Sequence, residues 1–145
     1  MADFKYFTLR ELCDSDVAKA RRIDNFPSWT VVEHLTELTK NILEPLRAAW
    51  GSSIIVNSGY RCDALNRAVG GVATSAHRIG YAADLVPGNG KIDEFAKFVK
   101  EWLVKNNVKF DQVISERSGT QKWIHVGLRS TTGSQRCETK NLVVK

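Results

Sequence analysis

The chain lacks long apolar runs, cysteine pairs and a hydrophobic leader. None of its apolar stretches approaches the ~20 residues of a membrane-spanning helix, so no membrane partner is expected. Its three cysteines, Cys13, Cys62 and Cys137, lie far apart and form no C-x-x-C pair, which favours reduced thiols over a thiolate zinc site or a disulfide framework. The amino-terminal segment has no charged region followed by an apolar one. We therefore expect synthesis in the cytoplasm without a signal peptide.

The positive charge of the chain is diffuse. Its 21 lysine and arginine residues exceed its 16 acidic residues, giving a net charge of +5 and a pI of about 9.2. A basic surface can meet nucleic acid, anionic lipid or an acidic wall polymer. However, no dense basic run with interleaved aromatic residues appears, so a nucleic-acid-binding function rests on the pI alone. We expect no nucleic-acid partner.

Hydrophobic periodicity divides the chain into helices and strands. Apolar residues recur three or four positions apart in residues 30–50 and 91–106, as on one face of an amphipathic helix. Pro45 falls inside the first pattern and predicts a kink or a new helix there. Short β-branched or alternating runs predict strands at residues 53–57, 82–86, 110–115 and 122–128.

These elements predict one α+β domain, which we place at residues 1–145. Shorter helices are expected after Thr8, which can cap the first of them, and at residues 17–23 and 63–69. The tail from residue 130 is rich in serine, threonine and lysine and is expected to be loose until Leu142. The predicted architecture is a small antiparallel sheet packed against helices.

Two histidines and one aspartate form a candidate metal site. His77 lies in a glycine-flanked turn, Asp84 follows in a predicted strand, and His125 lies in another predicted strand. Imidazole nitrogens and a carboxylate oxygen are usual ligands of a catalytic zinc ion, whose fourth position stays open for water. Strand alternation allows His125 and Asp84 to project from one sheet surface, with His77 closing a tripod over them. The third histidine, His34, lies in a predicted helix and is expected to be an ordinary solvated side chain.

An ordered series of motifs surrounds these residues. The series resembles the M15 group of zinc peptidases, the D-Ala-D-Ala carboxypeptidases and dipeptidases that cut bacterial wall peptides, and is most similar to its small phage and bacterial branch. The resemblance covers residues 6–129 and leaves the tail, residues 130–145, outside it. It implies the hedgehog/DD-peptidase-like fold. The motifs are Phe7-Thr-Leu-x-Glu-Leu, Asp24-Asn-x-Pro27, Leu43-Glu-Pro-Leu-Arg47, Ser58-Gly-Tyr-Arg61, Leu65-Asn66, Gly70-Gly71, Ser75-x-His77, Gly80-x-Ala-x-Asp84, Phe110-Asp-Gln112 and Trp123-Ile-His125.

The resemblance implies roles for particular residues. It makes His77, Asp84 and His125 the ligands of one zinc ion. It makes Arg61 the active-site arginine, which would bind the scissile carbonyl oxygen as negative charge develops or hold a substrate carboxylate. Ser58 is a weaker candidate for a substrate hydrogen bond.

Ser75 is a second weak candidate for substrate binding, and it is equally well interpreted as a turn former. The general base departs from the family pattern. The dipeptidase branch has a glutamate three positions before the second histidine, where this chain has Lys122. The nearest acidic residue is Glu116, which we expect to act as the base if the loop at residues 117–121 folds back. The alternative is an exposed glutamate at a strand end.

The sequence therefore predicts a monomeric zinc metallopeptidase that hydrolyses peptidoglycan stem peptides, as a D-Ala carboxypeptidase or as a lytic endopeptidase. The alternative is a non-catalytic zinc-containing module that binds the cell wall. The hedgehog signalling domain resembles the same fold without the activity, and Lys122 keeps this alternative open. A wall substrate without a signal peptide suggests a phage or prophage lysin that reaches the wall after holin-type release.

Overall fold

The computed structural model describes residues 4–144. The expected absence of a signal peptide rests partly on residues 1–3, which lie outside the described residues. Helical segments dominate the first half of the chain, and strands dominate the second. The helical elements are α1 (Leu9–Cys13), α2 (Asp16–Ala20), α3 (Trp29–Leu38), η1 (Thr39–Leu43), α4 (Glu44–Trp50), α5 (Asp63–Ala68), η2 (Ala76–Ile79) and α6 (Ile92–Lys105). The strands are β1 (Ile54–Ser58), β2 (Ala82–Pro87), β3 (Gln112–Ser118), β4 (Gln121–Gly127) and β5 (Glu138–Val143).

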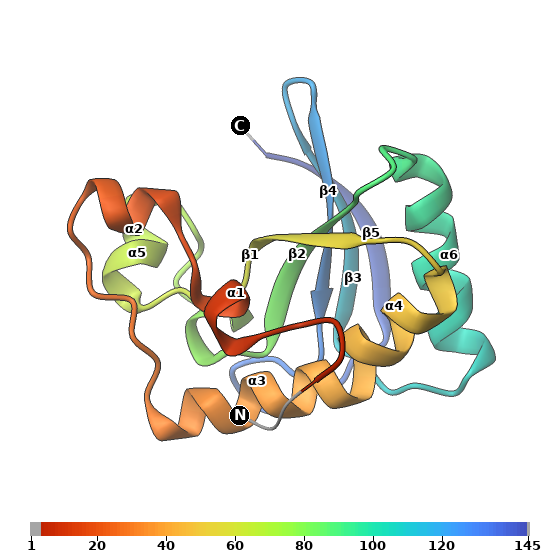
Figure 1. Ribbon diagram of the computed structural model, residues 1–145, viewed down its shortest axis with the longest axis horizontal. Helices are drawn as coiled ribbons and strands as arrows, with labels where there is room; N and C mark the ends of the chain where they lie inside the picture. Colours follow the sequence, from red (N-terminus) through yellow and green to blue (C-terminus); the bar gives the residue numbers. More distant parts are fainter. Residues whose placement is uncertain (1–3, 145) are drawn as a thin grey trace.

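The strands form one five-stranded sheet in the order β1-β2-β4-β3-β5. The first four are paired antiparallel, and β5 pairs parallel with β3 at the edge of the sheet. Helices α3, α4 and α6 lie along the sheet, while α2 and α5 lie together beyond its end (Figure 1). This arrangement confirms the predicted α+β class.

The tail was predicted wrongly. Residues 138–143 form β5, so the chain is ordered well before Leu142. Backbone pairing starts the strand, because the amides of Cys137 and Glu138 donate to the carbonyls of Phe110 and Asp111, each at 2.9 Å. The polar sequence of the strand gives little sign of this, since β5 is an exposed edge strand whose stability comes from pairing with β3.

The long amphipathic pattern at residues 30–50 becomes three consecutive helical segments. A π-helical turn, η1, lies between α3 and α4, and Pro45 occupies the first turn of α4. Proline fits that place because it has no N–H to donate and the amides of a first turn lack partners within their own helix. The predicted irregularity near Pro45 is observed as this π-helical turn, while the backbone stays helical from α3 into α4. Gly51 ends α4 in the left-handed conformation, with φ of +79°, which suits glycine.

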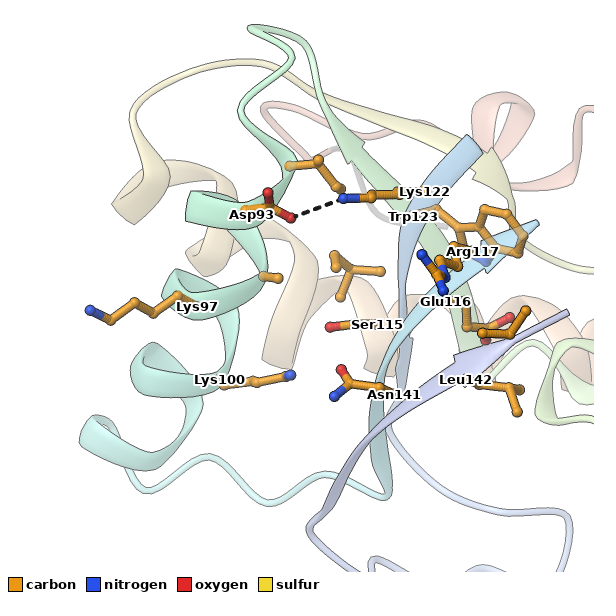
Figure 2. A pocket seen from close by; sticks show the side chains of 14 residues that line it. Asp93, Lys97, Lys100, Ser115, Glu116, Arg117, Lys122, Trp123, Asn141 and Leu142 are labelled. Atoms are coloured by element: carbon orange, nitrogen blue, oxygen red, sulfur yellow. Dashed lines mark ion pairs between the residues drawn. The ribbon is translucent and has the colours of Figure 1, made fainter. Parts of the chain in front are cut away.

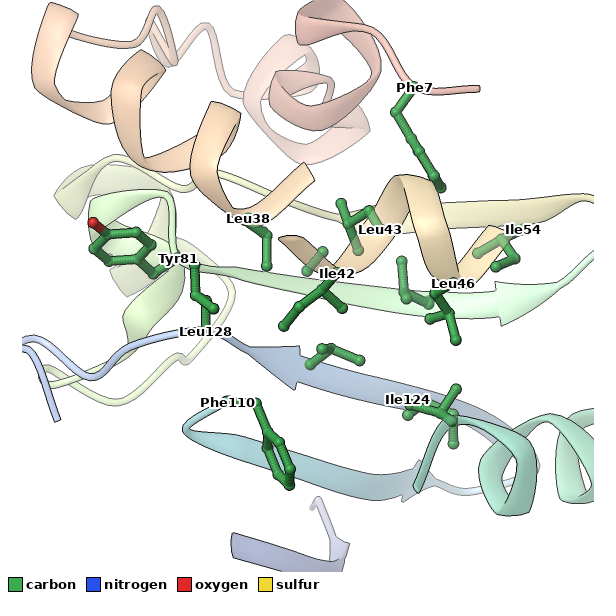
Figure 3. Close-up of a cluster of buried hydrophobic side chains, with 14 of the residues drawn as sticks. Phe7, Leu38, Ile42, Leu43, Leu46, Ile54, Tyr81, Phe110, Ile124 and Leu128 are labelled. Atoms are coloured by element: carbon green, nitrogen blue, oxygen red, sulfur yellow. The ribbon is translucent and has the colours of Figure 1, made fainter. Parts of the chain in front are cut away.

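The hydrophobic core lies between these helices and one face of the sheet (Figure 3). Leu38, Ile42 and Leu46 project from the helical side and are completely buried. Leu85 and Ile124 project from the strands to meet them. This packing gives the sheet one apolar face, so the opposite face is left for polar side chains. Within residues 4–144, no helix has the length and apolar content needed to cross a membrane.

Candidate metal centre

Cross-strand pairing aligns the candidate ligands on the sheet face opposite the core. Asp84 on β2 pairs directly with His125 on β4, and Ser58 on β1 pairs with Asp84 on its other side. His125 pairs in turn with Ile114 on β3, which pairs with Lys140 on β5. Because directly paired residues point to the same face, these five side chains form one row across the sheet.

The third member of the candidate group, His77, reaches this row from outside the sheet. His77 lies in the short helix η2, where its Nε2 is 3.1 Å from Asp84 Oδ1. His125 Nδ1 lies 3.0 Å from the same oxygen. One ligand atom from each of the three residues lies within 4.8 Å of the others, so the group could hold a metal ion. The structure thus brings together the three predicted ligands.

The hydrogen bonding of His77 shows why this group suits a cation. Its Nδ1 lies 2.7 Å from the carbonyl oxygen of Gly59, and a carbonyl only accepts, so Nδ1 carries the proton. Burial lowers the pKa of His77, which favours the neutral ring with a lone pair on Nε2. That lone pair faces a carboxylate oxygen of Asp84. Two lone pairs 3.1 Å apart repel each other unless a proton or a metal ion is shared between them.

The carboxylate of Asp84 is ionised. Burial alone would raise its pKa, but the neighbouring His77 and His125 outweigh that effect and hold the pKa well below its usual range. An ionised carboxylate is the form in which aspartate binds a metal ion. A hydrogen bond from the remaining ring N–H to a backbone carbonyl, as between His77 and Gly59, is also typical of metal-binding histidines.

Glycine at position 59 is required by local packing. A Cβ atom there would lie 2.1 Å from the carbonyl oxygen of Leu12 in α1, which is far inside any normal contact. The same Leu12 oxygen accepts a hydrogen bond from the amide of Tyr60 at 2.8 Å. Helix α1 therefore fixes the position of the Gly59 carbonyl, and that carbonyl orients the ring of His77.

Glu116 lies beside the candidate metal-binding group, which is His77, Asp84 and His125. It is paired with Trp123 across β3 and β4, and its Oε1 is 3.8 Å from His125 Nδ1. Burial raises its pKa, and the charge of Asp84 raises it further. No folding back of residues 117–121 is needed, because β3 continues through Ser118 and carries Glu116 to this face. The alternative of an exposed glutamate is wrong, since only 14% of the side chain is exposed.

Arg61 approaches the group from the turn after β1. Its amide donates to the carbonyl of His77 at 3.0 Å, and its Nη2 donates to Ser75 Oγ at 3.4 Å. Its Nε is buried and has no partner among the described residues. Burial lowers the pKa of the guanidinium, while Asp84 and Glu116 counteract this effect. A buried cationic donor without a partner is suited to an anionic or polarised oxygen of a ligand.

The two serines differ in their surroundings. Ser75 caps η2, where its Oγ accepts from the amide of His77 at 3.2 Å, so its turn-forming role is observed. It also lines the cavity over the metal-binding group. Ser58 lies across from Asp84 in β1, at a β-bulge, and is not among the described residues that line the cavity. Its role in substrate binding stays a prediction.

The cavity over this group has a volume of about 740 Å³. Arg61, Ser75 and the loop at residues 69–72 line one side of it. The opposite side is formed by residues that our sequence reasoning missed, which are Asp111, Arg136, Lys140 and Leu142. Only Asp111 stood in a recognised motif. The others lie in the tail, whose sequence does not indicate that it lies beside His77, Asp84 and His125.

Lys122 lies on the other face of the sheet. Its Nζ is 3.5 Å from Asp93 Oδ1 of α6, at the edge of a second cavity of about 650 Å³ between α6 and the strands (Figure 2). Strand β4 pairs regularly through residues 121–127, so residue 122 points away from the side that carries His125. Lys122 therefore does not enter the candidate metal centre.

His34 was predicted wrongly as a solvated side chain. It is half-buried, and its ring stacks on that of Tyr81 with the ring centroids 4.0 Å apart. Its Nδ1 lies 2.6 Å from the carbonyl oxygen of Ile79, two residues after His77. Helical periodicity alone could not reveal these partners, because both lie more than 40 positions away along the chain.

Comparison with known proteins identifies the family. No curated protein sequence matches the chain. The profile of the family described as Peptidase M15 matches residues 5–127, which include His77, Asp84, His125 and Glu116. The expected relation to these peptidases is thereby confirmed, while the tail with β5 lies beyond the match. The chain belongs to the peptidase M15 family.

Proposed function

We propose that the chain is a zinc-dependent peptidase that hydrolyses peptidoglycan stem peptides, as a D-Ala carboxypeptidase or as an endopeptidase. Membership of the family supports peptide hydrolysis. The observation that best supports the metal is the convergence of ligand atoms from His77, Asp84 and His125 within 4.8 Å of one another, with His77 Nε2 3.1 Å from Asp84 Oδ1. Two imidazoles and one carboxylate form a ligand set typical of catalytic zinc.

In this proposal His77, Asp84 and His125 hold one zinc ion. The ion would lower the pKa of a water molecule to ~7 and polarise the scissile carbonyl. The Gly59 carbonyl keeps the lone pair of His77 on Nε2, toward the ion. The direct pairing of β2 with β4 keeps Asp84 and His125 in position without help from a loop.

Glu116 is proposed as the general base. It is close enough to the metal-binding group to take a proton from a water molecule and return it to the leaving amine. Its raised pKa favours this exchange, since a carboxylate of ordinary pKa releases its proton more readily than it accepts one at neutral pH. Burial in strand β3 fixes its side chain for that task.

Arg61 is proposed to bind substrate. Arg61 lines the cavity over the candidate metal-binding group, and its Nε has no partner among residues 4–144. A guanidinium there can stabilise negative charge that develops on the carbonyl oxygen, or can bind a terminal carboxylate through two parallel hydrogen bonds. Ser75 holds this guanidinium in place through its Oγ.

The alternative is a zinc-containing module that binds the wall without cleaving it. The decisive experiment incubates the purified protein with a synthetic stem pentapeptide and analyses the products by mass spectrometry, with chelator and after zinc is restored. We expect cleavage that chelation abolishes and zinc restores. Glu116→Gln should lose at least a hundredfold in kcat, in line with the contribution of a general base, while it still binds one zinc ion.

The matched control is Glu94→Gln, at an exposed position of α6, which should keep full activity. Zinc binding without cleavage in the unmodified chain would favour the binding module. Cleavage that survives Glu116→Gln would exclude Glu116 as the base and leave the peptidase assignment intact.

A further inference from the structure

One wall of the cavity comes from a part of the chain that the family profile does not cover. Strand β5 and the residues on either side of it supply Arg136, Lys140, Leu142 and Val144 to the cavity lining. All four follow residue 127, where the match ends. The chemistry therefore lies in the matched part, and the surface that faces a bound substrate on this side lies outside it.

Strand alternation points Lys140 into the cavity. Figure 2 shows Leu142 on the same side of the strands as Glu116 and Trp123, with Asn141 on the opposite side toward α6. Lys140 is two residues before Leu142 and therefore shares its side. The pairing of Lys140 with Ile114, and of Ile114 with His125, places Lys140 two strands from the metal-binding group. Two strand spacings of ~4.8 Å give a backbone separation of ~10 Å.

Lys140 is the cation on this wall that is open to a ligand. The guanidinium of Arg136 donates two hydrogen bonds of 2.8 Å to the carboxylate of Asp111, so its charge is already matched. Among the described residues, Lys140 forms an ion pair with Glu138 at 3.2 Å. Glu138 is itself held by Gln112 Nε2 at 2.7 Å, and the lysine side chain is 46% exposed. An incoming carboxylate can therefore share the ammonium group, which has three donors.

We propose that Lys140 binds a second carboxylate of the substrate, on the side of the metal-binding group away from Arg61. This inference rests on the proposed function. An extended peptide advances ~3.3 Å per residue, so ~10 Å corresponds to about three residues from the scissile bond. In a stem pentapeptide cut before its last D-Ala, the glutamate is the third residue back from that bond, and its free α-carboxylate is the group that Lys140 recognises.

This assignment orients the substrate. The terminal carboxylate lies toward Arg61, the scissile bond lies over the metal-binding group, and the glutamate lies over β5. Two cationic side chains at opposite ends of one cavity thus select a peptide with two separated negative charges. The arrangement favours carboxypeptidase cleavage over internal cleavage of the same peptide.

The experiment measures zinc-dependent cleavage of two substrates. One is a stem pentapeptide with a free glutamate α-carboxylate, and the other is the same peptide with that group converted to an amide. The unmodified protein should cleave the free acid with about fivefold higher kcat/KM, chiefly through KM, as expected for a half-exposed ion pair. Lys140→Met should reduce kcat/KM for the free acid to the value for the amide, and should leave kcat/KM for the amide unchanged. Lys140→Arg should keep most of the preference, and Lys105→Met, at the exposed end of α6, should keep all of it.

Each other outcome is decisive. A preference that survives Lys140→Met, or no preference in the unmodified protein, overturns the role of Lys140 while cleavage itself still supports the proposed function. If neither peptide is cleaved, the proposed function fails. Binding of the tetrapeptide product to the metal-free protein, measured by calorimetry, then tests Lys140 separately, and equal affinity for the free acid and the amide overturns it. Circular dichroism verifies that each variant is folded.

Discussion

Replacing Asp84 by asparagine distinguishes a metal site from a buried ion pair. The substitution keeps the shape of the side chain and removes its charge. If His77 were protonated, Asp84 would be its ion-pair partner, and removing one member of a buried pair costs about 3–5 kcal/mol. If the ring is neutral, as its burial and its bond to Gly59 indicate, an amide relieves the repulsion at Nε2. The metal-free variant should then be as stable as the unmodified protein or slightly more stable.

The same variant should lose its response to zinc. Zinc at a hundred times its dissociation constant stabilises the unmodified protein by about 2.7 kcal/mol. With an unfolding entropy of ~2.1 cal/mol/K per residue over 145 residues, the expected rise in Tm is about 9 °C. Asp84→Asn should show little of that rise, because one of three ligands is lost.

Calorimetric melts at pH 7.5, with chelator and with zinc, measure both quantities. The alternative of a buried ion pair predicts a fall in Tm of about 10–16 °C for the metal-free variant, from the same unfolding entropy. Such a fall, or an undiminished zinc response, would refute the assignment of Asp84 as a metal ligand in a neutral-histidine site.

Two further predictions concern the supports of the cavity. Burial alone would raise the pKa of Asp111, but hydrogen bonds from Arg136 outweigh this effect and lower the pKa. The Asp111–Arg136 pair therefore stabilises the fold above pH ~3.9, and its contribution disappears as the pH falls through the lowered pKa. Urea unfolding measures the fall in the free energy of unfolding between pH 6 and pH 3. This fall should be about 1 kcal/mol smaller for Asp111→Asn than for the unmodified protein, and equal falls would contradict the pairing. Gly59→Ala should cost about 3 kcal/mol or more, because its Cβ meets the Leu12 carbonyl, whereas Gly127→Ala, with ordinary contacts of 3.6 Å, should cost under ~1 kcal/mol. Similar melting temperatures for these two glycine variants would contradict the close approach at position 59.

The sequence predicted the candidate metal ligands because each carries its own local signal. Alternation along residues 122–128 puts His125 on the polar face of a strand, and the glycine after His77 marks a turn. Burying the charge of an aspartate inside an apolar strand costs free energy unless the charge has a partner, so Asp84 indicates a functional or paired site. Local sequence could not show that Asp84 and His125 pair directly, since register depends on the packing of the whole sheet.

The missed features depend on contacts between distant segments. Strand β5 has a polar sequence and is held by its pairing with β3, so no local sequence pattern indicates that Lys140 lines the cavity. The predicted strand at residues 110–115 stopped before Glu116, because the outer half of the β3–β4 hairpin is polar. The surroundings of His34 were missed for the same reason, since the ring of Tyr81 reaches it from another part of the chain.

The position of Glu116 also answers the strongest argument for a non-catalytic module. That argument rested on Lys122, which stands where the dipeptidase branch has its glutamate. In this chain β4 is regular, so residue 122 faces α6 and an acid there would point away from His125. The neighbouring strand instead supplies a carboxylate 3.8 Å from His125 Nδ1. Lysine at position 122 is therefore compatible with catalysis, and the test of the base belongs at Glu116.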